Sequence, residues 1–260
     1  MTHWLDAVQR VLDQPDPGDR RRRALVLGDP LHRAADRCRE AGMEVVRVAT
    51  PHGVSVRRFD REPGDTVVWS DADSLPFEDG AFDLVVAHAT LEFCSDDRQV
   101  TGELGRVLRE GGQLVVRLPR RGRLTALDAL NLYRYTAEIT GRADVPVESM
   151  PIGWRRHYEE SDLDAIFAPS PLSPTRVDRC GLGLGELAYF PGLVATRAVL
   201  DRPSAAQRLR GWYARFGDLD EYMPGPATFV VTATREGSHA ETAPDDDPGR
   251  HFSNRDSLPV

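Results

Sequence analysis

Short apolar runs alternate with segments of helical periodicity over the first 120 residues, and this alternation limits the chain to few folds. Two of the runs, ALVLG at 24–28 and FDLVVAHA at 82–89, are apolar almost without interruption, as strands are when both faces of a parallel sheet are covered. Strands are expected at 24–28, 44–49, 65–71, 82–89 and 113–119. Helices are expected between them, at residues 3–13, 31–41 and 95–108. This order predicts an α/β fold with a doubly wound, mostly parallel sheet.

The second half of the chain is less regular and is expected to complete the same domain. Two strands, at 175–180 and 227–236, bring the expected sheet to seven strands. Helices are expected at 124–140, 161–167, 189–200 and 205–216. They exceed what a simple connection needs and predict a helical lid inserted before the last strand. We therefore expect an α/β half at 1–120, a lid with the last strands at 121–236, and a disordered tail at 237–260, where AETAPDDDPG is acidic and poor in apolar residues.

Charge and cysteine content exclude several classes of protein. All 33 basic residues are Arg and the net charge is −8, which argues against general nucleic-acid binding because that requires many phosphate contacts. Cys38, Cys94 and Cys180 are too far apart for a disulfide scaffold or a clustered metal site. We therefore expect no bound metal and a cytoplasmic protein. The apolar stretch 181–200 contains two charged residues and a proline, so no membrane span is expected.

The segment 75–118 carries the most specific pattern in the sequence. An acidic strand end at Asp71 is followed by LPFEDGAFDLVVAHATLEF (75–93) and by ELGRVLREGGQLVVRL (103–118). This pattern resembles the class I S-adenosylmethionine-dependent methyltransferases, especially the type 11 family that includes quinone- and sterol-modifying enzymes. The resemblance covers roughly residues 24–120. It implies a Rossmann-like seven-stranded fold and the transfer of a methyl group from S-adenosylmethionine to a small-molecule acceptor.

The resemblance also implies cofactor-binding and catalytic residues. Asp71 would accept a hydrogen bond from the adenine amine while Ala72 supplies a backbone amide; alternatively, Asp71 is a turn residue that bonds its own backbone. His88, at the end of the fourth strand, would face the sulfonium region of the cofactor or act as a general base. An isolated His at a strand end is, however, more often only hydrogen-bonded. His157 is the second candidate base.

The first loop departs from the family pattern G-x-G-x-G. It reads Gly28–Asp29–Pro30–Leu31–His32, so only the first glycine is kept. The acid expected at the end of the second strand is replaced by Ala49, followed by Thr50. A hydrogen bond to a charged group contributes about 1.5–3 kcal/mol, so losing it weakens cofactor binding roughly tenfold to a hundredfold. Gly28, Asp29 and Thr50 remain candidate cofactor contacts. The pair Asp29–Pro30 is alternatively a good helix start in its own right.

The expected lid is rich in aromatic side chains, which suit an apolar or aromatic acceptor and equally suit a helical cap packed on the sheet. They are Tyr133, Tyr135, Trp154, His157, Tyr158, Tyr189, Phe190, Trp212 and Tyr213. Arg155 and Arg156 would meet an anionic acceptor or be solvated. Gly181, Gly183 and Gly185 repeat the spacing G-x-G-x-G, but the strands that a second cofactor loop requires do not follow. These glycines are expected to turn the chain near the sheet edge or to leave room for a substrate.

Two functions from different classes remain open. An enzyme that methylates a small molecule is favoured by the intact adenine side of the pattern and by the aromatic lid. A degenerate methyltransferase-fold protein, acting as a scaffold, regulatory or binding subunit with a protein partner, is favoured by the broken first loop. Fold resemblance alone does not decide between them.

Overall fold

The structure is a computed structural model, and the part of the chain described below has defined bounds. It comprises residues 3–15, 20–28, 32–50, 66–122, 128–139, 155–183 and 225–237, with the single positions 141, 219, 222 and 223. The helices expected at 189–200 and 205–216, and nearly all of the expected tail, lie outside these residues.

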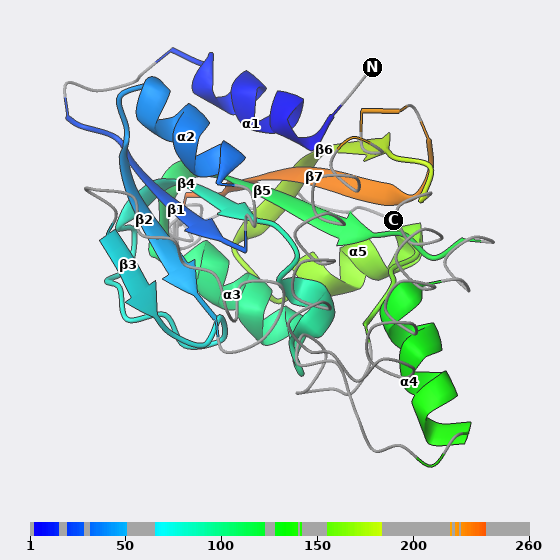
Figure 1. Cartoon of the computed structure of the whole chain (residues 1–260). Helices are drawn as coiled ribbons and strands as arrows, with labels where there is room; N and C mark the ends of the chain where they lie inside the picture. Colours follow the sequence, from blue (N-terminus) through cyan, green and yellow to red (C-terminus); the bar gives the residue numbers. More distant parts are fainter. Residues whose placement is uncertain are drawn as a thin grey trace, which may run out of the picture.

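The core of the molecule is a seven-stranded sheet in the order β3-β2-β1-β4-β5-β7-β6 (Figure 1). The strands are β1 Arg23–Leu27, β2 Glu44–Ala49, β3 Thr66–Trp69, β4 Phe82–Ala87, β5 Leu108–Pro119, β6 Leu172–Cys180 and β7 Thr228–Arg235. The first five are parallel, and β7 runs antiparallel to both of its neighbours. The prediction of a doubly wound, mostly parallel sheet is confirmed. The chain order reverses between β1 and β4, and ligands bind beyond the carboxyl ends of strands at such a point.

Helices cover both faces of the sheet (Figure 1). They are α1 Trp4–Leu12, α2 Arg33–Glu40, α3 Asp97–Val107, α4 Ala129–Ile139 and α5 Glu160–Phe167, with a 3₁₀ turn η1 at Leu91–Phe93. One apolar core joins α1 and α2 to the sheet through residues such as Val8 and Val86. The other core joins α3 and α5 to the opposite face through Leu104 and Val85. Alternate residues of β4 thus enter different cores, because successive strand side chains point to opposite faces.

Helix α1 runs along the central strands, from their carboxyl ends to their amino ends. It begins with a capping box, in which the His3 ring accepts from Leu5 N and the Asp6 carboxylate accepts from His3 N. Its first residue, Trp4, packs against His88 just beyond β4. After its last turn, Gln14 pairs with Gln113 near the other end of β5. Helix α1 therefore contacts both the carboxyl edge and the amino edge of the central strands.

Three local expectations are corrected by the structure. Strand β5 begins at Leu108 and not at the expected residue 113, directly after α3 ends at Val107, so Gly111 and Gly112 lie in an irregular stretch of that strand. Strand β4 ends at Ala87, since Ala89 has a left-handed φ of 49° that is incompatible with a strand. The pair Asp29–Pro30 does not start helix α2, whose N-cap is His32.

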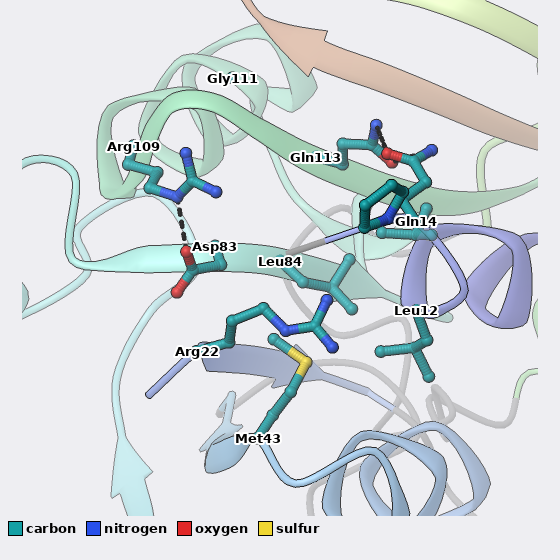
Figure 2. Close-up of a pocket in the computed structure, with 11 residues that line it drawn as sticks. Leu12, Gln14, Arg22, Met43, Asp83, Leu84, Arg109, Gly111 and Gln113 are labelled. Atoms are coloured by element: carbon teal, nitrogen blue, oxygen red, sulfur yellow. Dashed lines mark hydrogen bonds and ion pairs between the residues drawn. The ribbon is translucent and has the colours of Figure 1, made fainter. Parts of the chain in front are cut away.

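Asp83 fastens the amino edge of the sheet. Its carboxylate accepts from Arg23 N at 2.8 Å, from Arg20 Nη2 at 2.8 Å and from Arg109 Nε at 2.5 Å. Arg20 and Arg23 belong to a run of four arginines at 20–23. Both residues bind a buried carboxylate and are therefore not simply solvated. A pocket of about 300 Å³ lies here, with Asp83 and Arg109 at one end and the paired Gln14 and Gln113 at the other (Figure 2). It lies at the edge opposite the carboxyl ends of the parallel strands.

Candidate functional site

The ends of β1 and β4 touch at the carboxyl edge of the sheet. His88 N donates to Leu27 O at 3.0 Å. Gly28 follows with φ +85°, and a Cβ placed on it would lie 1.5 Å from the His88 carbonyl oxygen. The first glycine of the loop is therefore required by the packing of two strand ends as well as by its own backbone conformation.

His32, the described residue at the end of the first loop, has a backbone conformation that glycine favours. His32 stands at the position of the third glycine and has φ 60°, in the left-handed region. Its Nε2 lies 3.2 Å from Nη2 of Arg47, a buried residue of β2. Ala49, at the position where an acid is expected, and the hydroxyl-bearing Thr50 that follows it are both buried at the end of β2. The predicted cofactor contact Asp29 lies outside the described residues.

A tight turn follows β3 and carries the predicted adenine-binding residues. Ser74 N donates to the Asp71 carbonyl at 3.4 Å, and the Ser70 hydroxyl donates to the same carbonyl at 3.1 Å. The turn is thus closed by the main chain of Asp71, and this residue is solvent-exposed at the sheet edge while Ala72 is buried. The role of Asp71 in binding adenine stays a prediction.

His88 lies in surroundings that disfavour its charged form. Its ring packs against Trp4 with 4.7 Å between the ring centroids. Burial, followed by the positive charges of Arg117 and Arg155, lowers the pKa of His88 well below its ordinary value of 6.5. The imidazole is therefore neutral at physiological pH and weakly basic, which argues against His88 as the general base.

A buried charge cluster lies beyond β4 and β5, and it consists of Glu92, Arg117, Asp128, Arg155 and His157. Glu92 and Asp128 are 0% and 1% exposed. Arg155 joins them, with Nη1 3.1 Å from Asp128 Oδ2 and Nη2 3.6 Å from Glu92 Oε1. Arg117 Nη1 lies 4.0 Å from the same Glu92 oxygen. The cluster contains two carboxylates and two guanidinium groups, so these four charges balance.

Asp128 and His157 form a carboxylate–imidazole pair within this cluster. His157 Nε2 lies 3.3 Å from Asp128 Oδ2, and Asn131 N donates to Asp128 Oδ1 at 2.9 Å. Burial acts to raise the pKa of Asp128, but the charge of Arg155 and the His157 hydrogen bond outweigh it and lower that pKa. An ionised carboxylate that holds one ring nitrogen orients the imidazole as in general-base catalysis.

The cluster is held in place by the side chain of Asn131. Its Nδ2 donates to Arg155 O at 2.9 Å, and its Oδ1 accepts from Arg155 N at 2.7 Å. Asp128 and Asn131 were not singled out as functional residues in the sequence. The available signal was an Asp three residues before an Asn at the start of a helical segment, a common capping pattern that does not indicate a site by itself.

Several other predicted residues have structural roles. Burial, followed by the charge of Glu92, raises the pKa of Cys94 to about 12, so this thiol is not an activated nucleophile. Arg155 is buried in the cluster and Arg156 pairs with Asp97 at 2.6 Å, so neither is simply solvated. Tyr158, an expected lid aromatic, is fully buried in the core beneath α3 and α5.

The second run of glycines turns the chain at the end of β6. Gly181 and Gly183 have φ of 76° and 80°. A Cβ on Gly225 would lie 2.1 Å from the Gly181 carbonyl oxygen, so the two segments pass in close contact. The prediction that these glycines turn the chain near the sheet edge is confirmed for Gly181 and Gly183, whereas Gly185 lies outside the described residues.

Within the described part of the chain there is neither a candidate membrane-spanning helix nor a candidate metal site. No helix there has the length and apolar character needed to cross a membrane. No group of three or more His, Cys, Asp or Glu side chains is arranged there to hold a metal ion.

The carboxyl ends of the strands carry polar groups of the kinds that a nucleoside cofactor with an amino-acid end would need. Asp71 is exposed at the β3 end, and the buried hydroxyl-bearing Thr50 lies at the β2 end. Buried polar atoms of Trp4, His88 and Glu92 have no hydrogen-bond partner among the described residues. Unsatisfied buried polar groups are uncommon in native proteins and indicate a missing ligand or water.

Sequence comparison relates the central part of the chain to methyltransferases. Residues 32–116 match the sequence profile of a methyltransferase domain. The ubiquinone/menaquinone biosynthesis C-methyltransferase UbiE of Xylella fastidiosa is 37% identical over 135 residues, which cover 44% of this chain and 46% of that protein. An uncharacterized 37.1 kDa protein in transposon TN4556 of Streptomyces fradiae is 35% identical over 120 residues, with 45% and 33% covered. The chain thus spans only a third to a half of the length of these relatives.

Solved structures share the fold over most of the chain. A protein solved as a candidate methyltransferase from Bacillus halodurans has a TM-score of 0.55 at 13% identity, with 90% of this chain and 99% of that chain covered. Phosphoethanolamine N-methyltransferase 2 of Haemonchus contortus, in complex with S-adenosylmethionine, has a TM-score of 0.54 at 14% identity, with 89% of this chain and 53% of that chain covered. The [4+2]-cyclase SpnF has 0.52 at 20%, with 89% and 80% covered. At these identities the likeness concerns the fold alone.

Proposed function

From the methyltransferase domain at residues 32–116 and the class I methyltransferase fold of the chain, we propose that the protein transfers a methyl group from S-adenosylmethionine to a small-molecule acceptor. The observation that carries this proposal is the carboxyl edge of the sheet. The exposed residue Asp71 after β3, the close approach of β1 and β4 at the switch point, and a histidine held by a carboxylate beside β5 all lie at the carboxyl ends of the parallel strands.

The cofactor would lie across the ends of β1, β2, β3 and β4. Asp71 and the backbone of Ala72 would bind the adenine, and Thr50 would bind the ribose hydroxyls. Gly28, Asp29 and His88 would line the methionine end. When bound, S-adenosylmethionine supplies an electrophilic methyl group, whose bonding electrons leave with sulfur to give S-adenosylhomocysteine.

His157 would remove the acceptor's proton. Its Nε2 is engaged by Asp128, so the other ring nitrogen, Nδ1, is the one that would take a proton from an O–H or N–H of the acceptor as the new bond to the methyl carbon forms. Asp128 stays ionised and stabilises the resulting imidazolium. His88, neutral and packed on Trp4, would form a wall of the site and not exchange protons.

The acceptor is proposed to be a small apolar or aromatic compound. The match to an enzyme of ubiquinone and menaquinone biosynthesis favours a ring-bearing molecule, and so does the aromatic content of residues 121–216. The three cysteines are all free thiols, which favours a reducing compartment such as the cytoplasm.

A second candidate function is a methyltransferase-fold protein without methyl transfer, acting as a scaffold, regulatory or binding subunit with a protein partner. The loss of two loop glycines and of the ribose acid favours it. The shared fold of the [4+2]-cyclase SpnF agrees with the general rule that one fold serves more than one function.

Calorimetric titration with S-adenosylmethionine separates the two functions. We expect the wild-type chain to bind the cofactor and Asp71→Ala to bind it at least tenfold more weakly, because a charge-assisted hydrogen bond is lost. Asp79→Ala is the matched control, since Asp79 is an exposed acid of the following turn that pairs with Arg106, and it should leave the affinity unchanged. Absence of binding at millimolar cofactor would remove the enzymatic function and leave the second candidate.

A further inference from the structure

Three side chains near the carboxyl ends of the strands have buried polar atoms without a hydrogen-bond partner among the described residues. They are Trp4 Nε1, His88 Nδ1 and both carboxylate oxygens of Glu92. Trp4 is 3% exposed and Glu92 is 0% exposed. An indole N–H can only donate, and an ionised carboxylate can only accept. Together these residues offer one donor and several acceptors to a ligand.

Trp4 and His88 are in direct contact, and Glu92 has the same two neighbouring arginine charges as His88. Trp4 comes from the start of α1, His88 from the end of β4 and Glu92 from η1. The rings of Trp4 and His88 are in contact, with centroids 4.7 Å apart. Arg117 and Arg155 lie 4.0 and 3.6 Å from Glu92, and the same two charges act on His88. The region adjoins Gly28 because a Cβ on this glycine would meet the carbonyl of His88.

The neighbouring first loop has lost the features that hold the amino-acid end of the cofactor in the family. Pro30 stands at the second glycine position and has no N–H to donate. His32 stands at the third glycine position, and its ring is directed to Arg47. The ammonium and carboxylate of the methionine portion therefore need partners from elsewhere in the chain.

We propose that Glu92 and Trp4 bind the amino-acid end of the cofactor, in place of the lost glycine cradle. The Glu92 carboxylate accepts from the α-ammonium group, and the Trp4 indole N–H donates to the α-carboxylate. Arg117 and Arg155 flank Glu92 and contribute two positive charges to the region. A zwitterion has no net charge, so it leaves the balance between these two arginines and the acids Glu92 and Asp128 unchanged. This inference rests on the proposed function, because it concerns the same cofactor.

Two nucleosides that differ only in the amino-acid end test the inference. S-adenosylhomocysteine carries the α-ammonium and α-carboxylate groups, whereas 5′-methylthioadenosine has the same thioadenosine without them. We expect calorimetry to give an affinity of the wild-type chain for S-adenosylhomocysteine at least tenfold above that for 5′-methylthioadenosine. Equal affinities would overturn the inference while leaving adenosine recognition, and with it the proposed function, in place. Binding of neither nucleoside would overturn both.

Glu92→Gln and Trp4→Phe then identify the groups involved. Each variant should bind S-adenosylhomocysteine roughly tenfold to a hundredfold more weakly than wild type, since a hydrogen bond to a charged group is lost. The affinity of each variant for 5′-methylthioadenosine should stay within about twofold of the wild-type value. Retained 5′-methylthioadenosine binding also reports that the variant is folded. Glu160→Gln, at an exposed Glu of α5, is the control and should change neither affinity. A loss that is equal for both ligands, or a loss for neither, overturns the assignment.

Discussion

The two histidines that sequence reasoning treated alike have different chemical surroundings. His88 has no carboxylate among the groups that shift its pKa, and two arginines and burial oppose its protonation. His157 Nε2 lies 3.3 Å from Oδ2 of Asp128, a carboxyl group whose pKa is lowered. At the scale of single residues, these surroundings favour His157 over His88 for the proposed proton-transfer role.

His157→Gln is expected to lower kcat for methyl transfer by roughly a hundredfold or more, the usual effect of removing a general base. The rate is measured as S-adenosylhomocysteine released with an acceptor that the wild-type enzyme methylates. The affinity for S-adenosylmethionine should stay the same, because His157 is not among the proposed cofactor contacts. An unchanged kcat would exclude His157 as the base.

The stability of the folded chain is expected to fall as the pH is lowered from 7 to 5, and His88 should cause part of this slope. The unfolded His88 takes up a proton near its ordinary pKa of 6.5, whereas the folded residue does not until well below that. The unfolded state thus binds more protons in this window, and stability increases with pH by up to about 1.4 kcal/mol per pH unit from this residue. Urea unfolding of wild type and His88→Phe at pH 7 and 5 measures it. Equal slopes for the two proteins would contradict the assigned environment.

At the scale of elements, the N-terminal end of helix α3 contacts the segment that carries His157. Helix α3 starts at the N-cap Asp96, whose carboxylate accepts from Arg98 N and Gln99 N at 3.0 Å each. Its first residue, Asp97, pairs with Arg156 in the segment that carries His157. The start of α3 therefore connects the core of the sheet with the buried charge cluster.

Asp96→Ala is expected to lower the free energy of unfolding by about 1 kcal/mol, since an N-cap that satisfies two helix N–H groups is lost. Thermal or urea unfolding of the two proteins measures the difference. Ser95→Ala, one residue earlier and exposed, is the control and should change stability by less than about 0.5 kcal/mol. A similar effect of the two substitutions would argue that the cap carries no specific stabilisation.

At the scale of the whole molecule, chemistry and fastening occupy opposite edges of one sheet. The proposed cofactor site and the buried charge cluster lie at the carboxyl ends of the parallel strands. Asp83 joins three segments at the opposite, amino ends, and Figure 2 shows its pair with Arg109. The proposed cofactor binding and the stabilisation by Asp83 can therefore be tested separately by mutation.

Asp83→Asn is expected to lower the free energy of unfolding by about 1–3 kcal/mol, because the carboxylate is buried and accepts from a backbone amide and two guanidinium groups. The affinity for S-adenosylmethionine should be unchanged. Glu44→Gln is the comparison, since the Glu44–Arg23 pair is exposed and 3.6 Å apart and should contribute about 0–1 kcal/mol. A loss of cofactor affinity in the Asp83 variant would show that the two edges are coupled.

The sequence was a good guide to the sheet and a poor guide to the charge cluster. Apolar strands such as FDLVVAHA can be recognised in the sequence because burial on both faces of the sheet requires a nearly continuous apolar run. The pairing of Glu92, Arg155 and Asp128 joins residues up to 63 positions apart. Isolated charged residues in loops carry no periodic signal, so their association depends on tertiary contacts that local patterns do not encode.

His32 has one further consequence for anyone redesigning this protein. A non-glycine residue in the left-handed region costs about 1–3 kcal/mol, and His32 already follows that path with φ 60°. Replacing it with glycine would relieve conformational strain without rerouting the main chain, although it would remove the ring that faces Arg47. A tighter cofactor cradle could therefore be rebuilt from this position by side-chain exchange, with a compensating change at Arg47.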